Sequence, residues 1–228
     1  MISSDFLLTD KSCKLTMTTT CKSPLAGLYG ITDAQLMPED VLFHKVEQAL
    51  QGGATLIQYR DKSKDSIKRL SQARRLVQIC RQYNRPLLIN DDIDLAIEAS
   101  ASGVHLGQQD GSVEEARREL GTDSIIGVTC HNSLDLSLQA QDEGANYVAF
   151  GAFFPSSTKP NAKPASIELL HDARQQLQIP IVAIGGIRVD NADQLIKAGA
   201  HMLAVVHSLF AADNVKARAQ QYTHIFSQ

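Results

Sequence analysis

Short apolar runs alternate with longer amphipathic segments about eight times between residues 27 and 206. Each run has the length of a buried strand, and the segments between them carry apolar residues at three- and four-residue steps, as amphipathic helices do. Strand and helix alternating eight times is typical of a (β/α)8 barrel. We therefore predict an α/β fold, a single TIM barrel. The predicted strands are 27–31, 55–59, 86–90, 103–106, 125–128, 146–150, 181–185 and 202–206, and the clearest predicted helices are 65–83, 112–120, 133–144, 166–177 and 190–199.

A doubly wound open sheet is the main alternative to the barrel. No GxGxxG pattern follows the first apolar run, and nothing in the sequence marks the reversal of strand order that such a sheet needs. Ser112 and Ser133 stand at expected N-cap positions, and Gly121 and Gly199 follow predicted helices. These capping residues support the alternation of strands and helices, and we favour the barrel.

The first 25 residues do not continue this pattern. They are rich in threonine and lack the charged start and long apolar middle of a signal peptide. We expect residues 1–25 to form a short N-terminal extension, either poorly ordered or a structured arm. Residues 26–228 are then the catalytic barrel domain.

Charge and cysteine content exclude several classes of protein. The formal net charge is -3, so no overall positive field attracts nucleic acid or anionic membranes. No apolar run approaches the ~20 residues that span a bilayer. The cysteines show neither CxxC nor paired spacing, which argues against a zinc site or a disulfide framework and indicates the reducing cytoplasm. They are Cys13, Cys21, Cys80 and Cys130.

Two carboxylates follow neighbouring predicted strands. Asp91 comes after the run 86–90, and Asp110 follows the run 103–106. Active sites of barrels lie at the carboxyl ends of the strands, so these side chains can converge there. Mg²⁺ prefers few carboxylates, several waters and phosphate oxygens. The alternative is that each aspartate only caps a helix, but Ser112 already serves that purpose after Asp110.

The segment 58-QYRDK-62 ends the second predicted strand. Side chains alternate along a strand, so Gln58 should face the barrel interior, and Arg60 and Lys62 should lie at its mouth. Two cations beside a metal suggest that a polyphosphate binds there. A surface salt bridge with Lys62 or Lys64 is the simpler interpretation of Asp61.

Two further segments can bind phosphate. Gly185-Gly186 lets the backbone approach a ligand at the end of the seventh strand, although it also suits a plain tight turn. Residues 156-SSTK-159 offer three hydroxyls and a lysine in a long loop, which is either a lid or a solvated connection. His105 and Cys130 are better explained as packed core residues than as catalytic ones.

Five short motifs carry most of these polar strand ends: QYRDK (58–62), LINDDIDLA (88–96), GVHLGQQD (103–110), FFPSSTKPNAKPA (153–165) and VAIGGI (182–187). In their order and spacing they closely resemble the thiamine phosphate synthase family, over nearly all of residues 27–210. The resemblance implies a (β/α)8 barrel, in agreement with the alternation. It also implies a transferase of thiamine biosynthesis that uses Mg²⁺.

The reaction that the resemblance implies joins two small molecules. The diphosphate of 4-amino-5-hydroxymethyl-2-methylpyrimidine condenses with 4-methyl-5-(2-phosphoethyl)thiazole, or its carboxylate, to thiamine phosphate. Diphosphate leaves, with CO2 if the thiazole is carboxylated. The family's mechanism is dissociative, because the C–O bond to diphosphate breaks before the thiazole nitrogen attacks. No protein nucleophile is required. The resemblance leaves the oligomeric state open, a homo-oligomer included.

Site residues follow from the resemblance, position by position. Three cations, Arg60, Lys62 and Lys159, are the expected catalytic groups, since they neutralise charge on the leaving diphosphate. The expected metal ligands are Asp91 and Asp110. The expected substrate-binding residues are Gln58, Arg60, Lys62, Asn90, Thr129 and Lys159 for the pyrimidine diphosphate, Ser156, Ser157, Thr158, Gly186, Val206 and His207 for the thiazole phosphate, and Tyr59 and Asp61 for the substrates in general.

This sequence departs from the family at His207, where a small hydroxyl residue is usual, and that puts the local phosphate contact in doubt. Three alternatives to the synthase remain. A thiazole tautomerase of the same superfamily should lack Asn90, Asp91 and Asp110. A non-catalytic thiamine phosphate-binding barrel has no leaving diphosphate to neutralise. Another phosphate-binding barrel enzyme, such as one of tryptophan synthesis, would leave the pair Asp91 and Asp110 unexplained.

Overall fold

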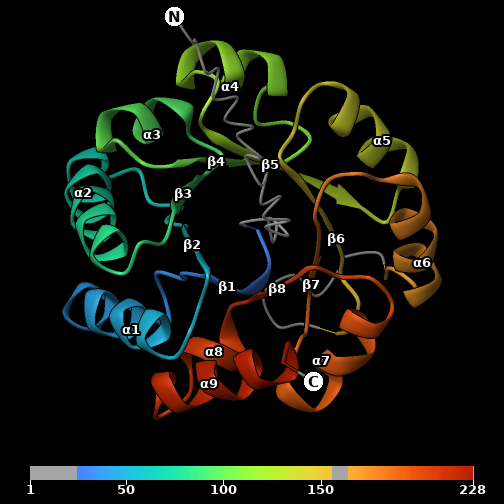
Figure 1. Ribbon diagram of the computed structural model, residues 1–228. Coiled ribbons are helices and arrows are strands. Elements are labelled where there is room, and N and C mark those ends of the chain that lie inside the picture. Colours follow the sequence, from blue (N-terminus) through green and yellow to red (C-terminus); the bar gives the residue numbers. More distant parts are fainter. Residues whose placement is uncertain (1–24, 156–163, 228) are drawn as a thin grey trace, which may run out of the picture.

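The computed structural model describes residues 25–155 and 164–227, and Figure 1 shows a ring of helices around a central barrel. Eight parallel strands pair in chain order, and the last closes onto the first, which confirms the predicted TIM barrel. Residues 1–24, and with them nearly all of the predicted N-terminal extension, lie outside the described residues. The strands are β1 (Gly27–Ile31), β2 (Leu56–Tyr59), β3 (Leu87–Asn90), β4 (Gly103–Leu106), β5 (Ile125–His131), β6 (Tyr147–Phe150), β7 (Ile181–Ile184) and β8 (Met202–Val205).

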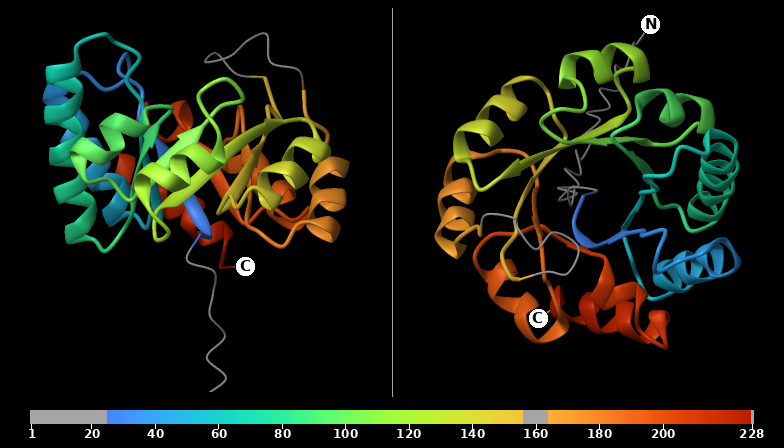
Figure 2. Two further views of the ribbon diagram at one scale, coloured as in Figure 1. Left: turned by 90° about the horizontal axis from the view of Figure 1, so that it is seen from above. Right: turned by 180° about the vertical axis from the view of Figure 1, so that it is seen from behind.

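Helices follow the strands and cover the outside of the barrel, as the side and rear views in Figure 2 show. The five helices predicted most clearly are present, and each differs from its predicted bounds by no more than two residues. Helices α1, α3, α8 and α9 were not singled out by the sequence pattern. The helices are α1 (Glu39–Gln51), α2 (Ser66–Gln82), α3 (Ile93–Ala99), α4 (Val113–Leu120), α5 (Leu134–Asp142), α6 (Ile167–Gln176), α7 (Val189–Lys197), α8 (His207–Phe210) and α9 (Val215–Ile225).

Local capping explains where several helices begin. The Ser112 hydroxyl accepts a hydrogen bond from the Glu115 amide at 3.0 Å, and Ser133 accepts one from the Leu136 amide at 3.3 Å, as predicted for N-caps. Asp92 caps α3 in the same way, at 2.9 Å from the Leu95 amide. Asp92 and Ser133 start their helices within two residues of a strand end, whereas Ser112 follows β4 after a short loop that carries Asp110.

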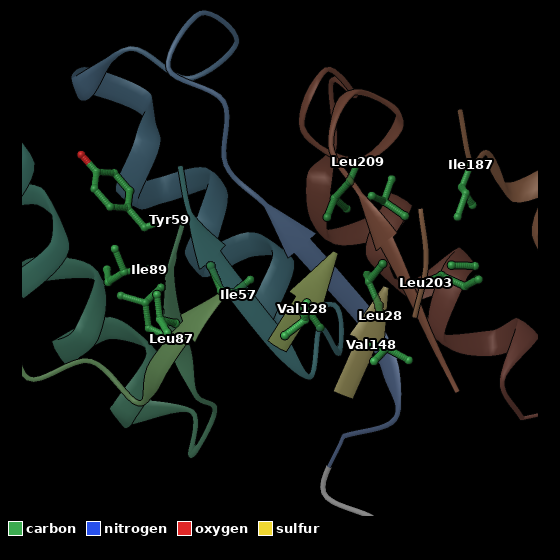
Figure 3. Packing of buried hydrophobic residues seen from close by; sticks show 14 of the residues in the cluster. Leu28, Ile57, Tyr59, Leu87, Ile89, Val128, Val148, Ile187, Leu203 and Leu209 are labelled. Atoms are coloured by element: carbon green, nitrogen blue, oxygen red, sulfur yellow. The ribbon is translucent and has the colours of Figure 1, made fainter. Parts of the chain in front are cut away.

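The buried residues form two separate regions. One lies between the strands and the surrounding helices, and we call it the shell; Figure 3 shows part of it, including Ile57, Leu203 and Leu209. The other lies within the barrel, and we call it the interior; its apolar members include Tyr29, Leu56 and Tyr147. Alternate residues of each strand enter one region or the other, as the period of a strand requires. In the described ranges, no helix combines the length and apolarity of a membrane-spanning segment.

Candidate active site

Polar side chains gather around one cavity of about 670 Å³ at the carboxyl ends of β2, β3 and β4. Five of the predicted site residues border it, and they come from three different strand ends. Acidic side chains of α3 and α4 extend its outer wall. The lining residues are Asp61, Lys62, Ser63, Arg69, Asn90, Asp91, Asp92, Ile93, Asp94, Asp110, Glu115 and Glu119.

Asp91 is held in an unusual backbone conformation directly after β3. Its φ is 63°, in the left-handed region that only glycine, asparagine and aspartate adopt readily. Its amide donates to the carbonyl of His105 at 2.9 Å, which ties it to β4. The carboxylate oxygen Oδ2 accepts from Lys62 Nζ at 2.5 Å and from Asn90 Nδ2 at 2.6 Å. Strained residues of this kind cluster at functional sites.

Asp110 brings a second carboxylate into hydrogen-bonding contact with Asp91. Burial and the Asp91 carboxylate together raise the pKa of Asp110. Burial acts to raise the pKa of Asp91 as well, but the hydrogen bond and charge of Lys62 lower it overall. Gly107 makes this arrangement possible: its amide donates to Asp110 Oδ2 at 3.0 Å, and a Cβ at that position would lie 2.4 Å from the same oxygen.

The donor set of this pair suits a hard cation. Asp91 and Asp110 offer only carboxylate oxygens and face an open, solvent-filled cavity, whereas a third acidic, cysteine or histidine ligand is not grouped with them in the described part of the chain. Mg²⁺ is typically held by one or two carboxylates, with waters and substrate phosphates completing its shell. Two adjacent carboxylates beside a lysine therefore fit a magnesium ion that binds together with a phosphorylated ligand.

The segment 58–62 alternates between the two faces of β2. Gln58 is 1% exposed and donates from Nε2 to the Tyr29 hydroxyl at 2.6 Å inside the barrel. Arg60 directly follows the last residue of β2, and its amide donates to Thr32 Oγ1 at 2.8 Å. Lys62 reaches Asp91 and borders the cavity. Gln58 thus faces the interior as predicted, and Lys62 lies at the mouth of the barrel.

Tyr59 and Asp61 face away from the barrel axis. The Tyr59 hydroxyl donates to Gln72 Oε1 of α2 at 2.8 Å, within the shell. Asp61 accepts from the Ser63 amide and from Lys68 Nζ at 3.1 Å. The expected salt bridge of Asp61 with Lys62 or Lys64 is therefore wrong, since its partner is Lys68, one turn into α2. Burial acts to raise the pKa of Asp61, but the hydrogen bonds from Ser63 and Lys68 lower it overall.

Three of the predicted thiazole phosphate residues are described, and they follow β7 and β8, at the other side of the barrel mouth. Val206 packs against the interior, and His207 is the exposed first residue of α8. Gly186 has a φ of 62°, and a Cβ there would lie 2.4 Å from the Pro155 carbonyl oxygen. The space that this glycine leaves is thus already occupied by the loop after β6. Residues Ser156, Ser157, Thr158 and Lys159 lie outside the described residues.

A line of hydrogen bonds inside the barrel was not predicted, although Gln58 was expected to face the interior. His105 is buried, as expected for a core residue, but it also bonds to Tyr147 and to Thr129. Tyr147 in turn contacts Tyr29, the partner of Gln58. All five side chains occupy alternate strand positions that point into the barrel. This alternation could have indicated the group, but 103-GVHL-106 looks like an apolar run. Cys130 is fully buried, and burial raises its thiol pKa to about 12, which agrees with a packed cysteine.

Comparison with known proteins assigns this chain to a family. A model of the family described as thiamine monophosphate synthase matches residues 28–209. The chain belongs to this thiamine monophosphate synthase family. A protein of Saccharophagus degradans named thiamine-phosphate synthase is 55% identical over 194 residues, which cover 85% of this chain and 89% of that protein. A protein of Nitrosococcus oceani with the same name is 50% identical over 90% of this chain and 94% of its own length.

A solved structure extends the family likeness to the fold. The thiamine phosphate pyrophosphorylase from Pyrococcus furiosus superposes with a TM-score of 0.81 at 34% identity, covering 90% of this chain and 96% of that one. Together the comparisons confirm the resemblance to the thiamine phosphate synthase family and the predicted enzyme class, a transferase. The roles of single residues in this family member rest on its own geometry.

Proposed function

We propose that this member of the thiamine monophosphate synthase family joins the pyrimidine diphosphate to the thiazole phosphate, or to its carboxylate, and releases diphosphate. The observation that carries the proposal is the contact between Lys62, Asp91 and Asp110 at the carboxyl ends of β2, β3 and β4. A cation and a close carboxylate pair beside an open cavity suit a ligand that combines phosphate oxygens with a divalent metal. Relatives named thiamine-phosphate synthase at 50% and 55% identity support the same reaction.

The cations of the site assist departure of the diphosphate. In the dissociative reaction the methylene C–O bond breaks, the electron pair stays on the diphosphate oxygen, and the aminopyrimidine ring delocalises the cation left behind. Lys62 is 60% exposed at its side chain, so it can turn from Asp91 towards a phosphate oxygen. Arg60 and Lys159 are the other proposed partners of the diphosphate. Positive groups placed where negative charge develops lower the barrier, and losing one typically costs ~3 kcal/mol.

The metal belongs to the same step. Asp91 and Asp110 would hold the Mg²⁺, which when bound neutralises charge on the diphosphate oxygens. Asn90 fixes the Asp91 carboxylate by its hydrogen bond at 2.6 Å. These roles explain why Lys62 contacts the carboxylate pair. The lysine balances the negative charge of Asp91 and Asp110 before the metal and the substrate bind.

The remaining binding groups are proposed on both sides of the barrel mouth. Gln58, Asn90 and Thr129 would contact the pyrimidine, whereas Gly186, Val206, His207 and the segment Ser156, Ser157 and Thr158 would hold the thiazole phosphate. We further propose the cytoplasm as the compartment, supported by Cys80 and Cys130, which are buried free thiols.

The test is a coupled assay of diphosphate release and thiamine phosphate formation with both substrates. Asp91→Asn is the sharpest variant, because asparagine tolerates the left-handed backbone of this position and only the charge is lost. We expect magnesium-dependent product from the unsubstituted enzyme and a loss of roughly 100-fold in kcat for the variant. Asp110→Asn should behave similarly.

The matched control is Asp193→Asn, which removes an equal charge from an exposed pair with Lys197 on α7. It should leave the kinetics unchanged. If the unsubstituted enzyme makes no thiamine phosphate, the synthase proposal fails, and a tautomerase or a binding protein explains the barrel better. If Asp91→Asn keeps full activity and full magnesium dependence, the proposed metal site is wrong.

A further inference from the structure

Five side chains form a continuous line of hydrogen bonds across the barrel interior. Gln58 Nε2 donates to the Tyr29 hydroxyl at 2.6 Å, and the two hydroxyls of Tyr29 and Tyr147 are 2.9 Å apart. The Tyr147 hydroxyl lies 2.8 Å from His105 Nδ1, and His105 Nε2 lies 2.8 Å from Thr129 Oγ1. The line thus connects β2, β1, β6, β4 and β5 in turn. Its two ends, Gln58 and Thr129, are the proposed pyrimidine contacts.

The middle of this line is rigidly enclosed. Tyr29, Tyr147 and His105 are 1%, 0% and 9% exposed. The His105 and Tyr147 rings stack with an interplanar angle of 17°, and Tyr29 meets Tyr147 edge-on. Gly127 provides the space for this ring, because a Cβ there would lie 1.9 Å from Tyr147 Cζ. Burial raises the pKa of both tyrosines, so both hydroxyls keep their protons and can donate.

The direction of the hydrogen bonds follows from the Gln58 end. The distances alone allow either hydroxyl to donate, but with Gln58 Nε2 as the donor to the Tyr29 oxygen we infer that Tyr29 donates to Tyr147 and that Tyr147 donates to His105 Nδ1. His105 then carries its proton on Nε2 and donates to the Thr129 oxygen. The Gln58 carboxamide oxygen is left as an acceptor, without a hydrogen bond in the described part of the chain, and the Thr129 hydroxyl proton is left to donate.

We propose that Tyr29, Tyr147 and His105 are positioning residues that make Gln58 a hydrogen-bond acceptor and Thr129 a donor towards the pyrimidine ring. This inference rests on the proposed function for the identity of the ligand. The pattern matches an aminopyrimidine, whose exocyclic amine donates and whose ring nitrogens accept. A 4-oxo pyrimidine presents an acceptor where the amine donates, and it would meet the Gln58 oxygen with a second acceptor. The line therefore selects amino over oxo pyrimidines.

The first test determines the direction of the hydrogen bonds directly, and it requires neither substrate nor turnover. The tautomer of His105 is measured by 15N NMR in the full chain, labelled at histidine, at neutral pH without ligand. Its signals are assigned by comparison with His105→Gln. We expect the Nε2–H tautomer with Nδ1 as an acceptor. The Nδ1–H tautomer or an imidazolium would reverse or interrupt the line and overturn the proposal.

The second test measures discrimination between ligands. Dissociation constants are determined for 4-amino and 4-oxo pyrimidine monophosphates with the unsubstituted enzyme, Tyr147→Phe and the control Tyr83→Phe. Tyr83 is a suitable control because its hydroxyl also makes two hydrogen bonds, to Gln51 and Glu47, but in the outer helices. Thermal unfolding of each variant checks that the protein is folded.

Loss of the Tyr147 hydroxyl frees the Gln58 amide to turn over, so the two ligands should become more alike. We expect the amino-to-oxo preference to fall by roughly tenfold in Tyr147→Phe and to stay unchanged in Tyr83→Phe. Equal weakening of both ligands with an unchanged preference would show a purely structural role and overturn the proposal. If no thiamine phosphate is formed but the His105 tautomer is as expected, the proposed function fails while the hydrogen-bond direction stands.

Discussion

Leu76 and Tyr147 are equally inaccessible to solvent, at 0% exposure, but they lie in chemically different regions. Leu76 belongs to the shell between helices and strands, where it packs among aliphatic and aromatic side chains. Tyr147 belongs to the interior, where its hydroxyl contacts both Tyr29 and His105. The comparison indicates that shell packing stabilises the fold, whereas the interior uses some of its buried volume to orient groups at the mouth.

Buried polar side chains are tolerated in the interior because each makes at least one hydrogen bond. An unpaired polar group away from water costs several kcal/mol, but a connected network avoids that cost and fixes one arrangement of side chains. Gln58 and His105 are both buried and both hydrogen-bonded to interior hydroxyls. Hydrogen-bonded polar groups also occur in the shell, such as Tyr59 with Gln72 and Tyr222 with Ser208. Substitutions in the two regions should therefore have different consequences.

Leu76→Ala should give the largest effect on stability. It removes a fully buried side chain from the second half of α2, away from the carboxyl ends of the strands. We expect the free energy of unfolding to fall by ~3 kcal/mol, since the cavity cannot close completely. Urea unfolding measures this loss. A strong fall in kcat/KM of the folded enzyme would contradict the division between shell and interior.

Gly127→Ala tests how tightly the interior is packed. The new methyl group would collide with the Tyr147 ring, which is fully buried. We expect a loss of ~2 kcal/mol in unfolding free energy, within the usual range for overpacking. The same substitution in a Tyr147→Leu background should cost clearly less. Equal costs in both backgrounds would mean that Tyr147 is not the obstacle.

Tyr59→Phe tests whether a side chain on the outward face of β2 contributes to stability or to substrate binding. The hydroxyl bonds to Gln72, whose Nε2 already has no partner among the described residues. Its loss should lower the unfolding free energy by ~1 kcal/mol, because Gln72 Oε1 then lacks its donor. Chemical denaturation detects a change of this size. A raised KM for the pyrimidine diphosphate would instead support the sequence-based expectation that Tyr59 binds substrate.

The smallest expected effect is a loss of stability in mild alkali. Burial raises the pKa of the shell thiols Cys80 and Cys130 from 9.0 to about 12. As the pH rises above the ordinary value, unfolded thiols ionise while folded ones stay protonated, so the unfolding free energy decreases. Between about pH 7 and about pH 9 the change should be below ~1 kcal/mol. The double variant Cys80→Ala and Cys130→Ala should show a shallower decrease, and an identical slope would refute this origin.

The sequence predicted the barrel well because its two repeating patterns, the two-residue period of strands and the 3.6-residue period of helices, are both local. Alternation gave the eight strands, and the carboxylates Asp91 and Asp110 could be paired since they end neighbouring parallel strands. The hydrogen-bond line could not be predicted, because its members are separated by up to 118 residues and Tyr147 and His105 sit in runs that read as apolar. The close approach of the Pro155 carbonyl to Gly186 could not be predicted either, because it joins the loop after β6 to the end of β7.

The most direct test of the whole account is a product analysis with the purified full chain. Both substrates are supplied with Mg²⁺, each is then omitted in turn, and thiamine phosphate and diphosphate are quantified by mass spectrometry and phosphate analysis. The account predicts equal amounts of the two products, dependence on Mg²⁺, and loss of both products in Asp91→Asn. Diphosphate release without thiamine phosphate, or product formation that ignores Mg²⁺ and Asp91, would contradict it.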